Sequence, residues 1–534
     1  MSQPTKKQTF LHGAALLALA TAVVKVIGAL YKIPLKMVIG DQGYGYFTTA
    51  YDIYSVLLMI STAGLPVAMS RMISQAAALD DYNQVRRVYK TARAIFLGLG
   101  IVSTLLMVCF AAPLAKWLEQ PNASWAILFL GPCALLMGII STYRGFFQGQ
   151  GDMRPTSASQ VLEAFFKLVV GLGAAFALMR FFKSVPLAAG GAILGVTVSC
   201  AISVVYLYRK FRPAYDQLPQ SPDKPLSYMA TVKGLLAIAV PITVGSAGLQ
   251  LLTVLEQKLY MSQLLTSVGM SQDGADTVKG IYSMSLTIFN MPCAFIVPIS
   301  VSIIPAIASQ LTLLNDAGVR ETEESAARIT GLISLPCSVG LCLLAKPVMS
   351  LLGDYTGEKL ELATSLMAVL GVCIFLYAII QFTNSVMQAH GFAYIPVVNM
   401  LVAGIAKLAV VYYLTGNPNL GILGAPIGAM LSYATIGIMN LIAIGKVVPQ
   451  KPALVKNLLR PLLPAAIMGV AVYGSYWGLT KLLGEGGSRL ILCGAPIAVG
   501  VVVYCLAVVL CKSITREDCA LLPKGEKIAK LLHL

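Results

Sequence analysis

A set of charged residues stands out in this 534-residue chain because they fall inside long apolar stretches or close to their ends. Ionisable side chains are costly within a membrane, and where they occur they usually mark a ligand pathway or pair with one another. The basic members outnumber the acidic ones, so a cavity that they line would favour an anionic ligand over a cationic one. The candidate ligand-binding residues are Lys25, Lys32, Asp52, Arg71, Glu256, Lys258 and Lys279.

Lys25 is the deepest of these residues, about 15 residues and roughly 22 Å into the first apolar stretch if that stretch is helical. Lys32 follows almost two helical turns later, so the two lysines share a face. That face would suit an anion moving along it; alternatively, Lys25 pairs with a carboxylate. Asp52, in AYDIYSVLLM, is either a counter-ion for one of these lysines or part of a cation site.

The remaining charged residues can be explained by structural roles as well as by ligand binding. Arg71, at the inner end of its stretch, either reaches the interface or guards the mouth of a cavity. Glu163 and Lys167 have the spacing and order of a favourable intrahelical ion pair. Glu256 and Lys258 are too close in sequence to share a helix face.

The composition defines the class of protein. The chain is 57% hydrophobic and 12% charged, with a mean hydropathy of +0.78, whereas soluble domains carry about 25% charged residues. Its apolar runs reach the roughly 20 residues of a membrane-spanning helix, without the short alternating segments of a membrane barrel. We therefore predict an all-α polytopic membrane protein whose first helix is retained rather than cleaved as a signal peptide. The fourteen predicted spans lie near residues 10–37, 44–70, 92–115, 124–147, 157–180, 186–208, 233–262, 280–311, 327–352, 362–387, 394–415, 419–445, 458–482 and 489–511.

The net charge of +16 reflects topology rather than a nucleic-acid partner. Most Lys and Arg residues fall in alternate loops, which the positive-inside rule assigns to the cytoplasm together with both termini. The eleven cysteines form no CxxC pair and are expected to be buried small hydrophobes. With only three histidines, we expect no metal site and no cofactor. No loop holds a catalytic constellation or a phosphate-binding loop, so we do not expect an enzyme.

Two distant stretches repeat one pattern. RGFFQGQGDMRP (residues 144–155) and VMQAHGFAYIP (residues 386–396) share a Gln, a Gly and a Pro at nearly the same spacing. We expect inner turns in which glycine permits a tight reversal, with Arg144 at the cytoplasmic interface. Repeated bundles are a common transporter architecture. The predicted parts are an N-terminal lobe of six spans (1–208), a cytoplasmic linker (209–229), a C-terminal lobe of six spans (230–446), and two further spans with a cytoplasmic tail (447–534).

Three stretches carry a resemblance to a known family: IGALYKIPL, GLPVAMSRMISQ and YRGFFQGQGDMRPTSASQVLEAFFKLVVG. They resemble the MurJ-like and stage V sporulation protein B group, the lipid II flippase branch of the multidrug/oligosaccharidyl-lipid/polysaccharide exporter superfamily. The resemblance covers nearly the whole chain. It implies two pseudo-symmetric six-helix lobes that alternate access to a cavity lined by spans one, two, seven and eight, with a lipid-tail groove at spans thirteen and fourteen.

The resemblance also implies a substrate and its contacts. The family moves lipid II, an undecaprenyl-pyrophosphate-linked disaccharide pentapeptide, from the inner to the outer leaflet of the bacterial plasma membrane. The basic residues of the first span that contact the pyrophosphate map to Lys25 and Lys32, where other members often have arginine; lysine keeps the charge and loses the bidentate fork. The eighth span offers only Lys279. The implied partners are the lipid-linked glycan, membrane lipids and the cell-wall synthesis machinery.

Other functions fit the sequence less well. A flippase for another lipid-linked glycan (teichoic acid, capsule or exopolysaccharide unit) is the alternative, because charge alone does not choose the sugar. A drug/cation antiporter would need an acidic cavity and usually twelve spans. A membrane glycosyltransferase would need a catalytic carboxylate and a sizeable loop. The sequence does not separate a vegetative role in cell-wall growth and cell shape from a role in sporulation.

Overall fold

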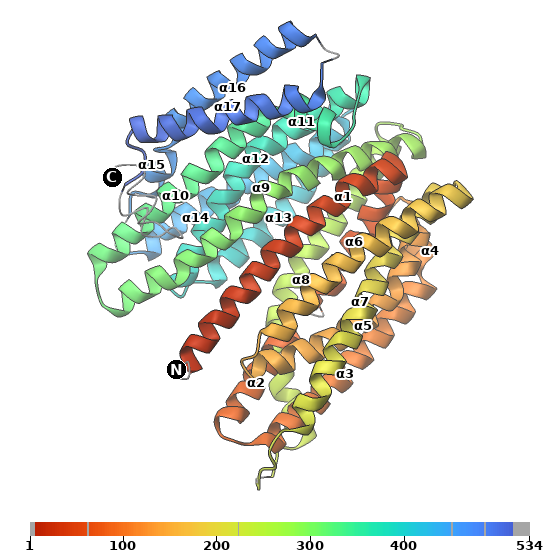
Figure 1. The fold of residues 1–534 in the computed structure, drawn as a ribbon, viewed down its shortest axis with the longest axis vertical. Coiled ribbons are helices and arrows are strands. Elements are labelled where there is room, and N and C mark those ends of the chain that lie inside the picture. The colour runs from red at the N-terminus through yellow and green to blue at the C-terminus, as the bar shows by residue number, and fades with distance from the viewer. Residues whose placement is uncertain (1–5, 61–63, 223, 450–451, 485–486, 516–534) are drawn as a thin grey trace. The chain divides into compact units, whose positions relative to one another are not determined.

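The computed structural model describes residues 6–60, 64–222, 224–449, 452–484 and 487–515, and within these ranges the chain forms helices and turns without strands (Figure 1). The chain divides into two compact units, residues 1–283 and 284–534. The predicted all-α class is therefore confirmed. The tail at residues 516–534 lies outside the described residues.

The membrane-spanning character of the chain is also confirmed. Eleven helical segments of the described chain are long and apolar enough to cross a membrane. Each predicted span overlaps one of the helices, so the structure is compatible with fourteen spans, although that count stays a prediction.

The first unit consists of helices packed side by side, with α7 in contact with α5 and α6, α5 with α3, and α6 with α1 (Figure 1). The predicted linker is partly helical, because α7 continues to Asp216 and α8 begins at Tyr228. The elements are α1 (Lys6–Met59), α2 (Leu65–Ala78), α3 (Tyr82–Cys109), α4 (Ala111–Trp117), η2 (Pro121–Ala123), α5 (Ser124–Gly149), α6 (Arg154–Phe182), α7 (Val185–Asp216), α8 (Tyr228–Thr266) and the part of α9 (Gln272–Thr312) that ends at Ser283.

Helix α1 folds back on itself at Gly40. This residue has φ 69° and ψ −176°, a region of backbone space essentially restricted to glycine. The rings of Tyr31 and Phe47 lie 5.8 Å apart on either side of the reversal, whereas a straight helix would separate them by about 24 Å. The first predicted span therefore corresponds to the first arm, residues 6–39. The second begins in the second arm, residues 41–59, which lies against the first, and ends in α2.

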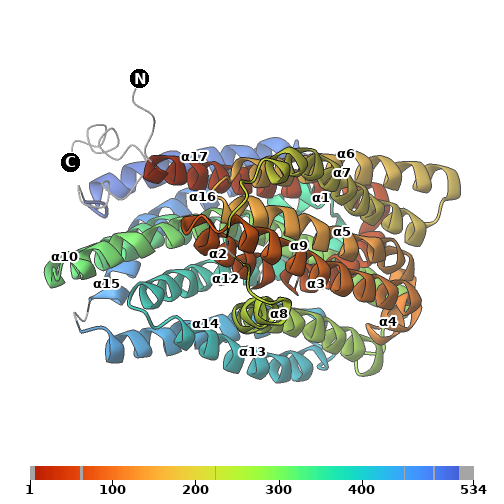
Figure 2. The same ribbon diagram turned by 90° about the horizontal axis from the view of Figure 1, so that it is seen from below.

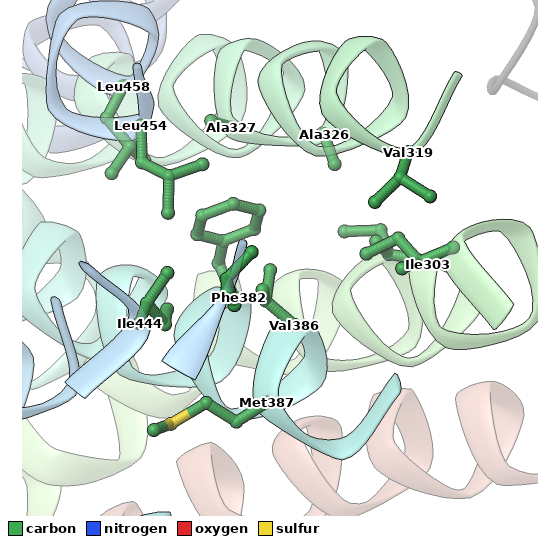
Figure 3. Close-up of a cluster of buried hydrophobic side chains, with 12 residues drawn as sticks. Ile303, Val319, Ala326, Ala327, Phe382, Val386, Met387, Ile444, Leu454 and Leu458 are labelled. Atoms are coloured by element: carbon green, nitrogen blue, oxygen red, sulfur yellow. The ribbon is translucent and has the colours of Figure 1, made fainter. Parts of the chain in front are cut away.

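The second unit has its own apolar core. The ring of Phe382, on α12, lies between side chains of α10 and side chains contributed by α14 and α15 (Figure 3). Helices α13 and α14 pack side by side (Figure 2). The elements that follow α9 are α10 (Asp316–Leu343), α11 (Ala345–Leu352), α12 (Gly357–Ala389), α13 (Tyr394–Thr415), η3 (Gly421–Leu423), α14 (Gly424–Val447), α15 (Leu454–Leu459), α16 (Leu462–Leu483) and α17 (Arg489–Leu510).

The two repeated sequence stretches form the same turn. The amide of Gly151 donates to the carbonyl of Gln148, and that of Asp152 donates to Phe147. In the second copy Gly391 and Phe392 repeat these bonds to Gln388 and Met387. Both glycines have left-handed φ, 81° and 84°, as in a Schellman motif that ends a helix. The predicted glycine reversals are confirmed. The boundaries of the predicted lobes are not tested by this likeness and stay a prediction.

Replacing Gly40 by alanine should destabilise the protein, because alanine is strained at this φ and ψ by about 1–3 kcal/mol. The measurement is the free energy of unfolding of the purified protein in detergent. Gly98, inside α3, is the matched control, since a Cβ there would meet nothing within 4 Å and its backbone is helical. Equal stability of the Gly40→Ala and Gly98→Ala proteins would contradict the role given to this reversal.

Candidate substrate-binding site

Two lysines flank one tyrosine ring where the second arm of α1 meets its first arm and α6. The ammonium of Lys32 lies 5.2 Å from the centre of the Tyr51 ring, and that of Lys167 lies 5.6 Å from it. Lys167 also approaches the Tyr51 hydroxyl at 3.5 Å. A tyrosine face attracts cations at such distances. Among the described residues, neither lysine has an acidic ion-pair partner within 4.0 Å.

The Tyr51 ring is held by an aromatic column along the second arm of α1. Phe47 stacks on it with ring centres 5.6 Å apart, and the Tyr54 ring lies tilted to it with ring centres 5.3 Å apart. Aromatic pairs at these separations add stability beyond the area that they bury. The column thus fixes the position of the ring that the two lysines share.

Asp52, the neighbour of Tyr51 in the chain, interacts electrostatically with Lys32 and also with a third lysine, Lys279. The charges that act on its carboxylate include Lys279, Lys32 and Glu256. Lys279 lies in the first part of α9 and is 0% exposed, and the carboxylates that act on it electrostatically are Asp52 and Asp276. The lysine and aspartate residues at this point therefore form one electrostatically linked cluster.

The ammonium of Lys279 is satisfied by a buried polar network. It donates to the Thr49 hydroxyl at 2.5 Å, and the side-chain amide of Gln257 donates to the same oxygen at 2.9 Å. The Thr49 hydroxyl in turn contacts the side-chain oxygen of Gln120. An ammonium out of contact with water requires such acceptors, because burying it without them is strongly unfavourable.

Asp276 accepts hydrogen bonds from α1, from its own helix α9 and from the connection between α4 and η2. Gln120 donates to one carboxylate oxygen at 2.9 Å, Gln272 to the same oxygen at 3.1 Å, and Tyr46 to the other at 2.9 Å. Since hydrogen bonds to a charged group stabilise more than neutral ones, this carboxylate is a structural anchor for the start of α9.

Close backbone contact places Lys279 at the cluster. A Cβ on Gly280 would lie 1.9 Å from the carbonyl oxygen of Asp41, directly after the reversal of α1. A Cβ on Gly45 would lie 3.0 Å from the carbonyl oxygen of Asp276. The absence of side chains at these two glycines lets α9 lie against the second arm of α1, which brings Lys279 within reach of Thr49.

A cavity of 340 Å³ opens beside Tyr51 and Lys167. It is enclosed by α1, α2, α5 and α6, and its lining includes Ser141, Arg144, Gln148, Gln160 and Glu163. Arg144 is 8% exposed, and it donates to Glu163 at 3.1 Å and to Ser159 at 3.0 Å. The cavity thus joins a basic and aromatic wall to several polar side chains inside the first unit.

One expectation from the sequence is corrected here. Arg144, which we expected at the cytoplasmic interface, is buried and paired with Glu163; its depth in the membrane stays a prediction. The predicted intrahelical pair is wrong in its partner, because Glu163 turns to Arg144 while Lys167 lies over Tyr51. The contact between α5 and α6 overrides the local spacing, because a buried guanidinium that lost its carboxylate would be left as an uncompensated charge.

The structure brings together Lys32, Asp52, Glu256 and Lys279, and it separates others. Lys258 pairs with Glu119 at 2.5 Å, in a partly exposed position, and Arg71 is exposed on α2 outside this cluster. Lys25 lies in the first arm of α1, but its side chain is outside the described residues. The assignment of these residues to a ligand stays a prediction. In the described part of the chain, no group of three or more His, Cys, Asp or Glu could hold a metal ion.

Sequence reasoning missed Lys167 and Tyr51 as members of the cluster, and it missed the network at Thr49 and Asp276. One signal was available for Lys167: it recurs as Lys407 after the second copy of the repeated turn. For Asp276, the spacing from Lys279 along α9 places both on one face. Nothing in the sequence pattern pointed to Thr49, whose role depends on contacts with residues far away in the chain.

These observations define a class: a multi-pass helical membrane protein with a partly buried basic cluster beside a polar cavity. Within this class, the chain belongs to the polysaccharide biosynthesis protein family, whose sequence profile matches residues 10–310.

Three proteins of Bacillus subtilis (strain 168) are similar along most of the chain. The uncharacterized membrane protein YabM is 26% identical, with 99% of this chain and 97% of YabM aligned. Stage V sporulation protein B is 24% identical over 83% of this chain and 85% of its own length. Lipid II flippase MurJ is 23% identical over 93% of this chain and 94% of its own length. The resemblance inferred from the sequence motifs is confirmed.

Solved structures agree on the fold. Lipid II flippase MurJ in an inward closed conformation superposes with a TM-score of 0.69 at 13% identity, covering 93% of this chain and 98% of that one. An inward-facing multidrug resistance transporter of the MATE family, in the MOP superfamily, gives 0.64 at 14% identity, covering 82% and 95%. At these identities the likeness establishes the fold alone.

Replacing Thr49 by valine should destabilise the protein by about 1–3 kcal/mol, because it leaves the buried Lys279 ammonium and the Gln257 amide without their acceptor. The free energy of unfolding in detergent is the measurement. Thr277→Val is the control, since the hydroxyl of Thr277 donates to the carbonyl of Asp273 in its own helix. A Thr49→Val protein as stable as the control would contradict the network's role.

Proposed function

We propose that this protein is a flippase that carries a lipid-linked glycan across the membrane, and that the glycan is the peptidoglycan precursor lipid II. The observation that carries the proposal is the pair of lysines around Tyr51. Lys32 on α1 and Lys167 on α6 place two ammonium groups beside one ring, and α6 is long and apolar enough to cross a membrane. A pyrophosphate is the polar group that joins such a glycan to its lipid.

The physical argument concerns repulsion between like charges. Lys32 and Lys167 act on each other electrostatically, and the nearby Asp52 is shared with Lys279. A bound dianion would relieve the repulsion and would interact strongly, because charges attract more in a poorly hydrated site than in water. Lysines act here as point charges, so they suit phosphate oxygens approaching from more than one direction.

The comparisons support the class of substrate. The family profile describes polysaccharide biosynthesis proteins, and one relative is named a lipid II flippase. The matched relatives and structures with a stated activity are transporters rather than enzymes. We further propose the bacterial plasma membrane as the location, with both termini cytoplasmic, alternating access as the mechanism, and the cell-wall synthesis machinery as a partner. A sporulation-specific role is suggested only by the similarity to stage V sporulation protein B.

The proposal is tested by rescue of cells depleted of their own lipid II flippase. The wild-type protein should rescue growth, whereas Lys32→Ala and Lys167→Ala should each lower the rate of lipid II flipping by about 10- to 100-fold, the value of one charge-assisted hydrogen bond. Lys32→Arg should retain activity, since it keeps the charge. Lys116→Ala, at an exposed site on α4, is the control. Membrane insertion of each variant is checked by fractionation.

The outcomes distinguish an error in the assigned substrate from an error in the assigned binding residues. If the inserted wild-type protein fails to rescue, the lipid II assignment is wrong and another lipid-linked glycan is tried in the same assay. If the wild type rescues and both alanine variants do so equally well, the substrate stands and the lysine pair is structural.

Outward movement of an anionic headgroup should be accelerated by a membrane potential that is negative inside, by about 2.3 kcal/mol per charge per 100 mV. Flipping of fluorescent lipid II in proteoliposomes, with the potential set by a potassium gradient and valinomycin, measures this dependence. Rates that do not change when both the potential and the ion gradients are collapsed would refute an electrical driving force.

A further inference from the structure

A second groove lies in the first unit, lined by none of the residues that enclose the cavity beside Tyr51. It is bounded by α3, α5 and α7 and has a volume of 350 Å³. Its lining residues are Tyr89, Arg93 and Leu97 of α3, Ile139, Thr142 and Tyr143 of α5, and Val204, Val205, Tyr208 and Arg209 of α7.

The groove is polar at one end and apolar at the other. On α3, Tyr89, Arg93 and Leu97 follow each other at intervals of about one turn on the same face, and the polar residues are nearer to the start of that helix. On α7 the order is reversed, with Arg209 nearer to its last residue and Val204 and Val205 deeper. The polar end therefore lies at the ends of the helices and the apolar end lies toward their middle. An amphiphile that lies along a membrane-spanning helix has the same gradient.

Arg93 and Arg209 differ from Arg86, Arg87 and Arg212, which lie on the same two helices. Both are exposed, and among the described residues neither has an acidic ion-pair partner within 4.0 Å, although Arg93 lies beside the Tyr89 hydroxyl. By contrast, Arg86 donates to the carbonyls of Leu218 and Pro219. Arg87 lies 3.7 Å from the ring of Tyr228, and Arg212 pairs with Asp216 at 4.0 Å. Arg93 and Arg209 line the groove, and among the described residues neither guanidinium is engaged by a carboxylate within 4.0 Å or by a backbone carbonyl.

The tyrosines of the groove add further donors. The hydroxyl of Tyr89 is buried and makes no hydrogen bond of ordinary geometry, although Arg93 lies close by. Arg93 also lies close enough to Tyr143 to act on it electrostatically, and the Tyr143 and Tyr208 rings are 6.5 Å apart. Guanidinium groups bind phosphate through paired N–H donors, and tyrosine is typical of membrane interfaces.

We propose that this groove binds an anionic glycerophospholipid. The phosphate lies between Arg93 and Arg209, and the proximal part of an acyl chain follows Leu97, Ile139, Val204 and Val205. Basic pockets between membrane helices on the cytoplasmic side are suited to such headgroups. A free phosphate ion would use only the polar half of the groove, whereas a phospholipid uses both. The bound lipid bridges α3 and α7, which are both in contact with α5.

The test compares phospholipid binding by the full-length protein and its variants in detergent, by titration under native mass spectrometry. Wild-type protein should prefer phosphatidylglycerol to phosphatidylcholine. Arg93→Ala/Arg209→Ala should bind phosphatidylglycerol about 30-fold more weakly, the expected loss for two arginines near a membrane surface. Arg154→Ala, an exposed arginine that begins α6, should bind like the wild type. Val205→Asp, which keeps both arginines, should also weaken phosphatidylglycerol binding.

Two further measurements make the proposal refutable. Unfolding of each variant in detergent establishes that a loss of binding is not a loss of fold. Unchanged preference in the double arginine variant overturns the site, and so does displacement of phosphatidylglycerol by inorganic phosphate at equal concentration. Displacement by lipid II that requires Arg93 and Arg209 would instead assign the groove to the transported substrate, and would also overturn the proposal.

Discussion

The first unit depends on one constraint: the ammonium of Lys279, which is 0% exposed, must be compensated without water. Thr49 accepts its hydrogen bond, while Asp52 and Asp276 supply negative charge. An uncompensated charge in such a place costs several kcal/mol. The surrounding helices therefore have to supply a hydrogen-bond acceptor and negative charge at this point. Gln120 and Gln257 complete the arrangement by holding Thr49 and Asp276 in position. The polar network thus contributes to holding α1, α8 and α9 together.

The backbone makes this compensation possible at two glycines. Gly40 turns α1 back on itself, so that a residue on one arm, Lys32, lies over the ring of Tyr51 on the other. Gly280 lets α9 approach the same reversal so closely that any side chain would collide with the backbone of Asp41. Neither glycine carries a charge, but the backbone geometry at these two positions determines which charged side chains come into contact. The chemistry of the cluster therefore follows from backbone conformations that carry no charge.

Much of the fold could be predicted from the sequence, because spans, charge bias and helix-ending glycines are local properties. The matching turns at Gly151 and Gly391 are an example, since the hydrogen-bond pattern follows from the chain itself. The partners of buried charges could not be predicted in the same way. Glu163 has Lys167 at a favourable spacing and nevertheless pairs with Arg144 from another helix. Such choices depend on which helices pack together and how dry the contact is, and neither quantity is visible in residue spacing.

The basic residues of the cluster fall into two kinds, and the difference bears on which of them can bind a ligand. Lys279 is fully buried and has its acceptor and carboxylates in place, so binding a new anion would mean giving up interactions already formed. Lys32 and Lys167 are only partly buried and share the weak attraction of one ring. For them an anion adds favourable interactions and removes mutual repulsion. A ligand's affinity comes from interactions that exceed those already formed in the free protein. The lysine pair at Tyr51, rather than the more deeply buried Lys279, is therefore the part of the cluster available to a substrate.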